Sequence, residues 1–475
     1  MIRASRLASV SLLAAFATAA AQQPTQQAAP QPSTITAADY KPKADSLIRA
    51  YLAETQAPSA AFAVIRGKDT LAYGAHGMAD IAGARAATAA NIYEIGSITK
   101  QFTSSAIMRL VEQGKVKLDD DMSKYIPQFP LQGNKVSIRQ LLNHTSGIHS
   151  YTASPEWQKT WGDPISPDAI INFVAKDTFD FKPGTGYRYN NTGYVMLGMV
   201  IEKVTGQKYA DHLAAQFFKP LGLTHTSYCP SKTTNPAFAK GYSRTPNGPA
   251  PAQFLDLSHP FAAGALCSTV GDLVKWERAL MSGKVVSPAS FTLMTTPDTL
   301  TTGRRINYGF GLTPGMVAGH KTVGHGGGIP GFTTSGIFVA EDSLSVVVFT
   351  NWDGAAPDGL AQNLLRAAYG LAPVTRQAPT SAAALPLADR AAIIGNYTLQ
   401  LPNGQALPMK VFFEGNRLLA QAQGQGANEL NHLGNRVFGM AFDPAIRVTF
   451  VFEGDKVTKM TLLQAGVTME GPRAP

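Results

Sequence analysis

The segment YEIGSITKQFTSSAIMRLVEQG, residues 93–114, places Ser97 three residues before Lys100. The apolar stripe that follows predicts a helix, and residues three apart share one helical face. A serine hydroxyl is a poor nucleophile unless a base accepts its proton, and a lysine can do so when burial keeps its amine neutral. The alternative is an N-cap serine beside a solvated lysine. No other Ser-x-x-Lys occurs in the chain.

Two later segments carry further candidate residues. In FKPGTGYRYNNTGYVMLG, Tyr189 supplies a phenol that can transfer protons, and Asn191 an amide that can hold an amine or a carbonyl. In VGHGGGIPGF, His325 is followed by glycines, which allow close backbone approach to a ligand and leave N–H groups unobstructed. The alternatives are a tyrosine that anchors a turn and a glycine bulge beside a surface histidine.

Strand-forming segments lie at both ends of the first 370 residues. Residues 61–80 predict a hairpin, residues 320–353 predict further strands, and the clearest helical segments lie between them, at 137–148 and 192–223. We therefore expect an α/β fold in which the first and last strands share one sheet, with a helical subdomain between them. Short strands joined by Asn-Gly and Glu-Gly turns then predict a small all-β C-terminal domain.

The predicted domain organisation has five segments. Residues 1–21 have two arginines before a short apolar run and small residues, which predicts a secretory signal peptide; the run is too short to cross a bilayer. The other four are a disordered linker at 22–38, the main domain at 39–375, a linker at 376–388 and the β domain at 389–475. The expected location is therefore periplasmic or secreted, with no stable membrane anchor after cleavage.

Composition excludes several function classes. Of the 475 residues, 15% are charged and 44% apolar, which is typical of a folded globular chain. Loss of Arg3 and Arg6 with the signal lowers the net charge from +9 to +7, and no basic run exists, so nucleic-acid binding is not expected. Cys229 and Cys267 either pair or remain two buried thiols, and neither fits a metal cluster.

The motifs together resemble one family. Ser-x-x-Lys, Tyr-x-Asn and His-x-Gly, in this order, are similar to the motifs of the penicillin-recognising serine hydrolases. IRQLLNHTSGI, YNNTGYVMLGMVIEKVTG and PLGLTHTS resemble the branch that contains class C β-lactamases, D-alanyl-D-alanine carboxypeptidases, D-aminopeptidases and β-lactamase-like esterases. The resemblance covers residues 40–370 and implies a β-lactamase/transpeptidase-like antiparallel sheet flanked by helices. The tail after Thr380 resembles the small β domain often appended in this family.

The resemblance also implies roles for individual residues. Ser97 would be the acylated nucleophile, Lys100 and Tyr189 its proton-relay partners, and Asn191 their support. The backbone N–H groups of Ser97 and Gly328 would form the oxyanion hole. Whether Lys100 or Tyr189 is the general base stays open, because the two would titrate as a coupled pair.

The third motif departs from that of the dedicated β-lactamases. They normally carry Lys-Thr-Gly, where this chain has His325, Gly326 and Gly327. His325 and Gly327 would support the substrate, with His325 donating a hydrogen bond to it or to Tyr189. A mostly neutral histidine and a glycine without a hydroxyl suit the carboxylate of a β-lactam poorly.

We therefore expect an exported, metal-independent serine hydrolase without a cofactor. Its substrates would be small esters or short peptides, including D-amino-acid peptides and cell-wall fragments. One alternative is a class C-like β-lactamase. The other is a non-catalytic protein that binds peptidoglycan or peptides. His149, Trp157 and Trp161 are candidates for the substrate cleft, and His144 is expected to be structural.

Overall fold

A computed structural model describes residues 35–245, 247–374, 385–400, 406–414, 417–422, 427–440, 446–464 and 467–474. The chain divides into two compact units between Pro373 and Val374, and each is described by itself. The predicted signal peptide and most of both predicted linkers lie outside the described residues. Helix α1 begins at Ala37 and helix α12 at Leu387, so each begins within the last residues of a segment expected to be a linker.

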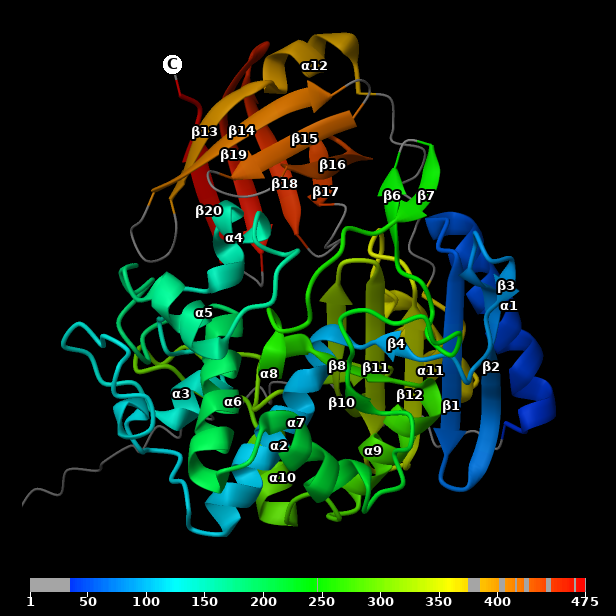
Figure 1. The fold of residues 1–475 in the computed structure, drawn as a ribbon. Coiled ribbons are helices and arrows are strands. Elements are labelled where there is room, and N and C mark those ends of the chain that lie inside the picture. Colours follow the sequence, from blue (N-terminus) through cyan, green and yellow to red (C-terminus); the bar gives the residue numbers. More distant parts are fainter. Residues whose placement is uncertain are drawn as a thin grey trace, which may run out of the picture. The chain divides into compact units, whose positions relative to one another are not determined.

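The first unit is built on an antiparallel sheet whose described strands have the order β3-β2-β1-β12-β11-β10-β9 (Figure 1). Strand β1 pairs with β12 in the register Ala60↔Thr350, so the expectation that the first and last strands share a sheet is confirmed. The strands are β1 (Ser59–Arg66), β2 (Asp69–Asp80), β3 (Arg85–Ala86), β9 (Thr313–Val317), β10 (His320–Ile329), β11 (Phe332–Val339) and β12 (Leu344–Thr350).

Both faces of this sheet are buried because successive side chains of a strand point to opposite sides. In β1, Phe62 and Val64 belong to the core shared with helices α1 and α11, whereas Ala61 and Ala63 belong to the core on the other side. Helix α9 covers this second face, where it packs on β1 and β12. The helices are α1 (Ala37–Thr55), α9 (Val270–Met281) and α11 (Asp358–Ala368).

The helical subdomain meets the sheet layer through helix α2. Phe102 of α2 stacks on Trp276 of α9 with ring centroids 3.8 Å apart, and α2 also packs on α6. Helix α6 in turn contacts α3, α5 and α8. The helices are α2 (Thr99–Glu112), α3 (Ile138–Leu142), α4 (Pro155–Gln158), α5 (Pro167–Val174), α6 (Asn191–Thr205), α7 (Tyr209–Leu213), α8 (Phe261–Gly264) and α10 (Pro288–Thr295), with the helical turns η1 (Gly96–Ile98), η2 (Met122–Lys124), η3 (Tyr151–Ala153) and η4 (Ala214–Phe218).

One predicted helix is shorter than expected. The segment 137–148 forms only α3, which ends at Leu142, because His144 has a φ of +63° and cannot continue a right-handed helix. Ser137 caps α3 through a capping box with Gln140. The rest of the segment is a loop. It contacts the residues just before α6, where the Arg188 N–H donates a hydrogen bond to the His144 carbonyl.

Small sheets complete the first unit. Strand β8 (Leu266–Ser268) pairs with β4 (Tyr93–Glu94) and with β5 (Ser227–Tyr228), and β6 (Tyr242–Thr245) pairs with β7 (Gly248–Pro251). A disulfide joins Cys229 to Cys267, which decides between the two alternatives for these cysteines. The disulfide ties the segment after β5 to β8, and β8 is hydrogen-bonded to the strand that leads to Ser97.

The second unit is a small β domain, as expected. Its described strands follow one another in sequence order in an antiparallel sheet, and a bridge between Tyr397 and Arg473 brings the first strand beside the residue after the last one. The elements are α12 (Leu387–Ile393), β13 (Gly395–Gln400), β14 (Ala406–Glu414), β15 (Arg417–Ala422), β16 (Ala427–Gly434), β17 (Val437–Met440), β18 (Arg447–Glu453), β19 (Lys456–Gln464) and β20 (Val467–Pro472).

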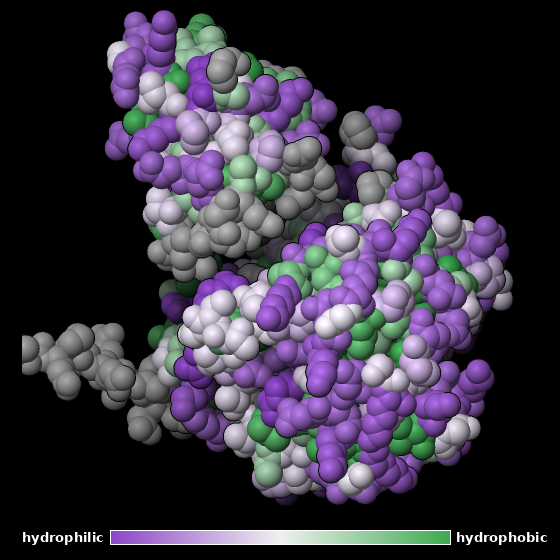
Figure 2. All heavy atoms as spheres, turned by 90° about the vertical axis from the view of Figure 1, so that its left-hand side faces the viewer, coloured by the Kyte–Doolittle hydropathy of each residue, from purple (hydrophilic) through white to green (hydrophobic). Residues whose placement is uncertain are grey.

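Two observations concern association with a membrane, the character of the described helices and the distribution of hydrophobic side chains on the surface. Within the described ranges, no helix combines the length and the apolar character that crossing a bilayer requires. On the face drawn in Figure 2, hydrophobic side chains occur in small groups among hydrophilic ones. The low charged fraction of the chain is therefore compatible with a largely polar surface on this face.

Candidate active site

The candidate nucleophile and base lie together at the start of α2. Ser97 occupies η1 and Lys100 the first turn of α2. The Lys100 Nζ lies 3.0 Å from the Ser97 Oγ, 2.8 Å from the Asn191 Oδ1 and 2.8 Å from the carbonyl oxygen of Ala263. Lys100 is completely buried, with 0% of its surface exposed. It is therefore not the solvated lysine of the alternative interpretation.

Burial controls the protonation of Lys100. Removal of the ammonium from water disfavours its charged form and holds the pKa of Lys100 well below its ordinary value. The hydrogen-bond partners of Lys100, Ser97, Asn191 and Ala263, are all uncharged. They occupy the hydrogen-bonding positions of the amine but do not stabilise its positive charge as a carboxylate would. The site therefore favours the neutral amine.

Tyr189 lies against the same amine. The centroid of its ring is 4.7 Å from the Lys100 Nζ, and Ser97 lies near enough to the phenol to lower its pKa. Burial of the phenol raises the pKa of Tyr189 well above its ordinary value, and the nearby Ser97 side chain opposes that rise. The residue keeps 36% of its surface exposed while its ring packs on His144, with centroids 4.3 Å apart. Tyr189 is thus a protonated phenol in contact with the serine.

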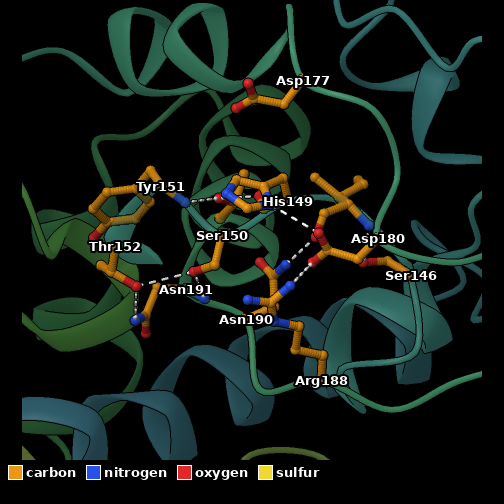
Figure 3. Close-up of polar contacts among 12 residues, drawn as sticks. Ser146, His149, Ser150, Tyr151, Thr152, Asp177, Asp180, Arg188, Asn190 and Asn191 are labelled. Carbon is orange, nitrogen blue, oxygen red and sulfur yellow. Dashed lines mark hydrogen bonds and ion pairs between the residues drawn. The ribbon is translucent and has the colours of Figure 1, made fainter. Parts of the chain in front are cut away.

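Asn191 is held by the loop after His149 (Figure 3). Its Nδ2 donates to Thr152 Oγ1 over 3.0 Å, and its backbone N–H donates to Ser150 Oγ over 3.2 Å. The two hydroxyls are 3.0 Å apart and hydrogen-bond each other. Because Thr152 accepts from the amide nitrogen, the amide oxygen is left to face Lys100. The loop therefore fixes which end of the amide the lysine meets.

His149 lies away from the cavity. Its Nδ1 pairs with Asp180 Oδ1 at 2.8 Å, and Arg188 binds the other carboxylate oxygen at 2.9 Å (Figure 3). His149 is not among the residues that line the cavity, so the interpretation of His149 as a cleft residue is wrong. Its backbone carbonyl instead accepts a hydrogen bond from the Thr192 hydroxyl in α6.

His325 uses both ring nitrogens within the protein. Its Nδ1 donates to the Gly326 carbonyl oxygen over 2.5 Å, so its Nε2 accepts from the Tyr308 hydroxyl over 2.8 Å. Burial lowers the pKa of His325 to about 4, and the protonated form of Lys100 adds to this effect. Neither ring nitrogen is therefore hydrogen-bonded to Tyr189; the ring packs on Tyr189 with centroids 6.1 Å apart.

Glycines bring the end of β10 against Ser97. Strand β9 pairs with β10 only as far as Gly324 in the described sheet, and the rest of β10 packs on η1. A Cβ on Gly96, whose φ is +49°, would lie 2.9 Å from the Gly328 nitrogen. A Cβ on Gly327 would lie 2.0 Å from the Ile95 carbonyl oxygen. The backbones of residues 95–96 and 327–328 are thus in direct contact.

A cavity of about 240 Å³ opens over Ser97. Trp157 and Trp161 line it, as the sequence suggested, and so does Gly328, whereas His325 and Gly327 do not. Its lining consists of Gly96, Ser97, Tyr151, Thr152, Trp157, Trp161, Asn191, Leu255, His259, Pro260, Ala263, Gly264, Gly328, Ile329 and Pro330. Within the described residues, no group of three His, Cys, Asp or Glu side chains could hold a metal ion.

Three contacts of the site were missed by the sequence analysis. The Ala263 carbonyl that accepts from Lys100 leaves no trace in the sequence, because every residue has a carbonyl. Tyr308, which binds His325, and Thr152, which orients Asn191, lie in no motif. A search for further tyrosines and threonines near the motifs would not have separated these two from the rest.

Comparison with known proteins places this geometry in a family. The family model described as Beta-lactamase matches residues 44–371, more than half of the chain. The chain belongs to the Beta-lactamase family. The family's segment lies within the first structural unit, and it contains all the candidate site residues.

Relatives are similar over most of this unit. The chain is 29% identical over 271 residues to a putative penicillin-binding protein PbpX of Bacillus subtilis, covering 57% of this chain and 65% of the relative. It is 27% identical over 334 residues to a D-aminopeptidase of Brucella canis, covering 70% of this chain and 63% of the relative. The matches thus span less than two thirds of these relatives' lengths.

A solved structure is similar over both units. The octameric penicillin-binding protein homologue from Pyrococcus abyssi is 26% identical, with a TM-score of 0.64, over 90% of this chain and 99% of that one. The expected fold class, a β-lactamase/transpeptidase-like sheet with a C-terminal β domain, is confirmed.

Substitution of the β10 glycines tests the close approach between β10 and the backbone just before Ser97. Gly327→Ala should destabilise the fold by about 1–3 kcal/mol, because its Cβ would overlap the Ile95 carbonyl and the Thr334 hydroxyl. Gly328→Ala is the matched control, since no atom lies within 4 Å of a Cβ there. Urea unfolding midpoints followed by fluorescence measure both. Equal midpoints for the two variants would contradict the contact between β10 and the backbone at Ile95.

Proposed function

We propose that this chain is an exported serine hydrolase that cleaves small esters or short peptides through an acyl-enzyme on Ser97. Family membership and the D-aminopeptidase relative support hydrolysis of amide or peptide bonds. The observation that carries the proposal is the contact between the Ser97 hydroxyl and a buried lysine. Peptides of D-amino acids and cell-wall fragments are included among the proposed substrates.

The partners of Lys100 support its role as the base. A neutral amine has two N–H groups and one lone pair. The Asn191 amide oxygen and the Ala263 carbonyl oxygen can only accept, so they take the two N–H groups. The lone pair then faces the Ser97 hydroxyl, which can donate to it. When the amine is protonated, this last hydrogen bond must reverse, and Ser97 loses its base.

The acylation step follows from this arrangement. Lys100 takes the Ser97 proton as the oxygen attacks the carbonyl carbon. Tyr189, a protonated phenol whose ring lies against Lys100, can donate a proton to the leaving group and regain one through Lys100. In this proposal Lys100, not Tyr189, is the general base. Water then hydrolyses the acyl-enzyme by the same proton path in reverse.

The backbone supplies the oxyanion stabilisation in this proposal. Ser97 and Gly328 both line the cavity, Gly96 beside Ser97 closely approaches the Gly328 nitrogen, and η1 opens α2, whose N-terminus carries positive dipole character. The N–H groups of Ser97 and Gly328 are the candidates to bind the negative oxygen of the tetrahedral intermediate. Asn191 and its loop keep the amide oxygen on Lys100 throughout.

The two alternatives have less support. A β-lactamase needs a cation for the carboxylate of its substrate, and His325, with a pKa of about 4, is neutral at physiological pH. A non-catalytic binding protein would have no use for a neutral lysine against a serine. The disulfide between Cys229 and Cys267 supports export to an oxidising compartment, the periplasm or the medium.

Ser97 is tested by covalent labelling. A fluorophosphonate probe should label the wild-type protein at Ser97, and p-nitrophenyl acetate should be hydrolysed. Ser97→Ala should abolish labelling and lower turnover by about 10²-fold or more, because the acyl-enzyme cannot form. Ser105→Ala, at another buried serine of α2, is the control. Labelling of both variants to the wild-type extent would refute the proposed function.

The pH dependence tests Lys100. Since protonation of the amine removes its lone pair, kcat/KM should fall as pH falls through the lowered pKa of Lys100, with the midpoint well below about 10.4. Lys100→Arg should lose about 10²-fold or more at every pH, because a guanidinium stays charged. His325→Gln should leave the midpoint in place, as His325 is already neutral above its pKa of about 4. A midpoint that disappears in His325→Gln would assign the limb to the histidine.

A further inference from the structure

The cavity over Ser97 has two distinct parts. Ser97, Asn191 and Gly328 lie at the reacting end. The remaining wall is dominated by hydrophobic side chains from three separate segments, the η3–α4 region, the loop before α8, and the end of β10. These side chains are Tyr151, Trp157, Trp161, Leu255, Pro260, Ile329 and Pro330.

The aromatic part of this wall is rigidly held. Trp157 is 2% exposed and packs edge-to-face on Tyr151, with ring centroids 4.8 Å apart, and on His259 at 5.0 Å. The Tyr151 hydroxyl donates to the His259 carbonyl over 2.7 Å. The ring of His259 is anchored through Nε2, which donates to the Asp163 carbonyl over 2.7 Å. The Tyr151 hydroxyl and the His259 Nε2 are thus bonded within the protein, the buried His259 Nδ1 has no partner among the described residues, and the faces and edges of the rings form the wall.

The polar groups at the reacting end carry no formal charge. They are hydroxyls and an amide, and Thr152 and Asn191 are already bonded to each other. No Asp, Glu, Lys or Arg occurs among the described residues that line the cavity. Lys100 lies beneath Ser97, and burial shifts its equilibrium toward the neutral amine. A cation entering the cavity therefore meets no carboxylate, and an anion meets no ammonium or guanidinium in its wall.

We infer that the acyl group delivered to Ser97 is uncharged and apolar, with an aromatic or branched aliphatic side chain that packs on Trp157, Trp161 and Leu255. The inference rests on the proposed function and narrows its substrate. Burying an unpaired ion costs far more than burying an amide. Esters of apolar acids and N-blocked aminoacyl groups are therefore favoured over free aminoacyl groups, which carry an ammonium beside the reacting carbonyl.

The first experiment varies only the charge of the acyl group. p-Nitrophenyl esters of 3-phenylpropanoic acid, N-acetylphenylalanine and phenylalanine, the last two in both configurations, share a phenyl group and a leaving group. At a pH below the α-amino pKa of about 7.7, each N-acetylphenylalanine ester should exceed the phenylalanine ester of the same configuration by about ten-fold or more in kcat/KM. The 3-phenylpropanoyl ester should exceed both phenylalanine esters by the same factor. The rate with Ser97→Ala is subtracted as background. A free amino ester that equals or exceeds its N-acetyl counterpart overturns the inference.

The second experiment places a charge in the wall. Leu255 is half-buried and lines the cavity, so a longer polar side chain has room to adjust there. Leu255→Glu should raise the ratio of free amino ester to N-acetyl ester by about five-fold or more relative to Leu255→Gln, because the two variants differ only in charge. An unchanged ratio would mean that the acyl group does not lie against Leu255, and would overturn the inference.

The third comparison tests the aromatic wall. Trp161→Ala should lower the ratio of 3-phenylpropanoyl to acetyl ester hydrolysis by about ten-fold, since it removes a ring from the wall while Trp157 maintains the buried packing. An unchanged ratio would contradict the placement of the side chain. Failure of these tests is distinguishable from failure of the proposed function, because fluorophosphonate labelling of Ser97 does not depend on the acyl preference.

Discussion

The buried amine of Lys100 is the interaction on which the rest of the site depends. A lysine that is completely enclosed, with hydrogen bonds to one hydroxyl and two uncharged oxygens, gives up its proton more readily than a solvated lysine. The state without the proton is also the one in which it can serve as a base. The same burial that makes the lysine costly to charge therefore makes the neighbouring serine a candidate nucleophile. The cavity wall, which has no charged side chain among its described residues, likewise makes a charged substrate group costly to bind.

The fold supplies this environment from segments that are far apart in sequence. The short spacing from Ser97 to Lys100 sets one pair, but the acceptors come from the start of α6 and from α8. The Cys229–Cys267 disulfide ties down β8, which directly follows α8, and the loop that holds Asn191 limits how far α6 can shift at that end. Glycines let β10 approach η1 without side chains between them. Each constraint affects the position or the surroundings of the Lys100 Nζ.

The sequence was sufficient for the fold class and for the residues with a distinctive chemistry. Strand periodicity at both ends of the first unit predicted the shared sheet, and the spacing of the motifs predicted the contact of Ser97 with Lys100. The limits were physical. A backbone acceptor such as the Ala263 carbonyl has no residue signature, and the positive φ of His144 ended a helix that the apolar pattern continued. For His325, the sequence could not show that Tyr308 and a carbonyl already occupy its nitrogens. The catalytic roles and the segment boundaries remain predictions.

The most direct measurement is the titration of Lys100 itself. In protein labelled with ¹³C at the lysine Cε, the signal missing from Lys100→Arg identifies this residue, and its shift can be followed with pH. The account predicts a titration well below the ordinary lysine pKa of about 10.4, with Ser97→Ala moving it as the hydroxyl partner is lost. A signal that titrates near 10.4 would show a charged ammonium in the folded protein at neutral pH, and would contradict the claim that burial makes Lys100 a base.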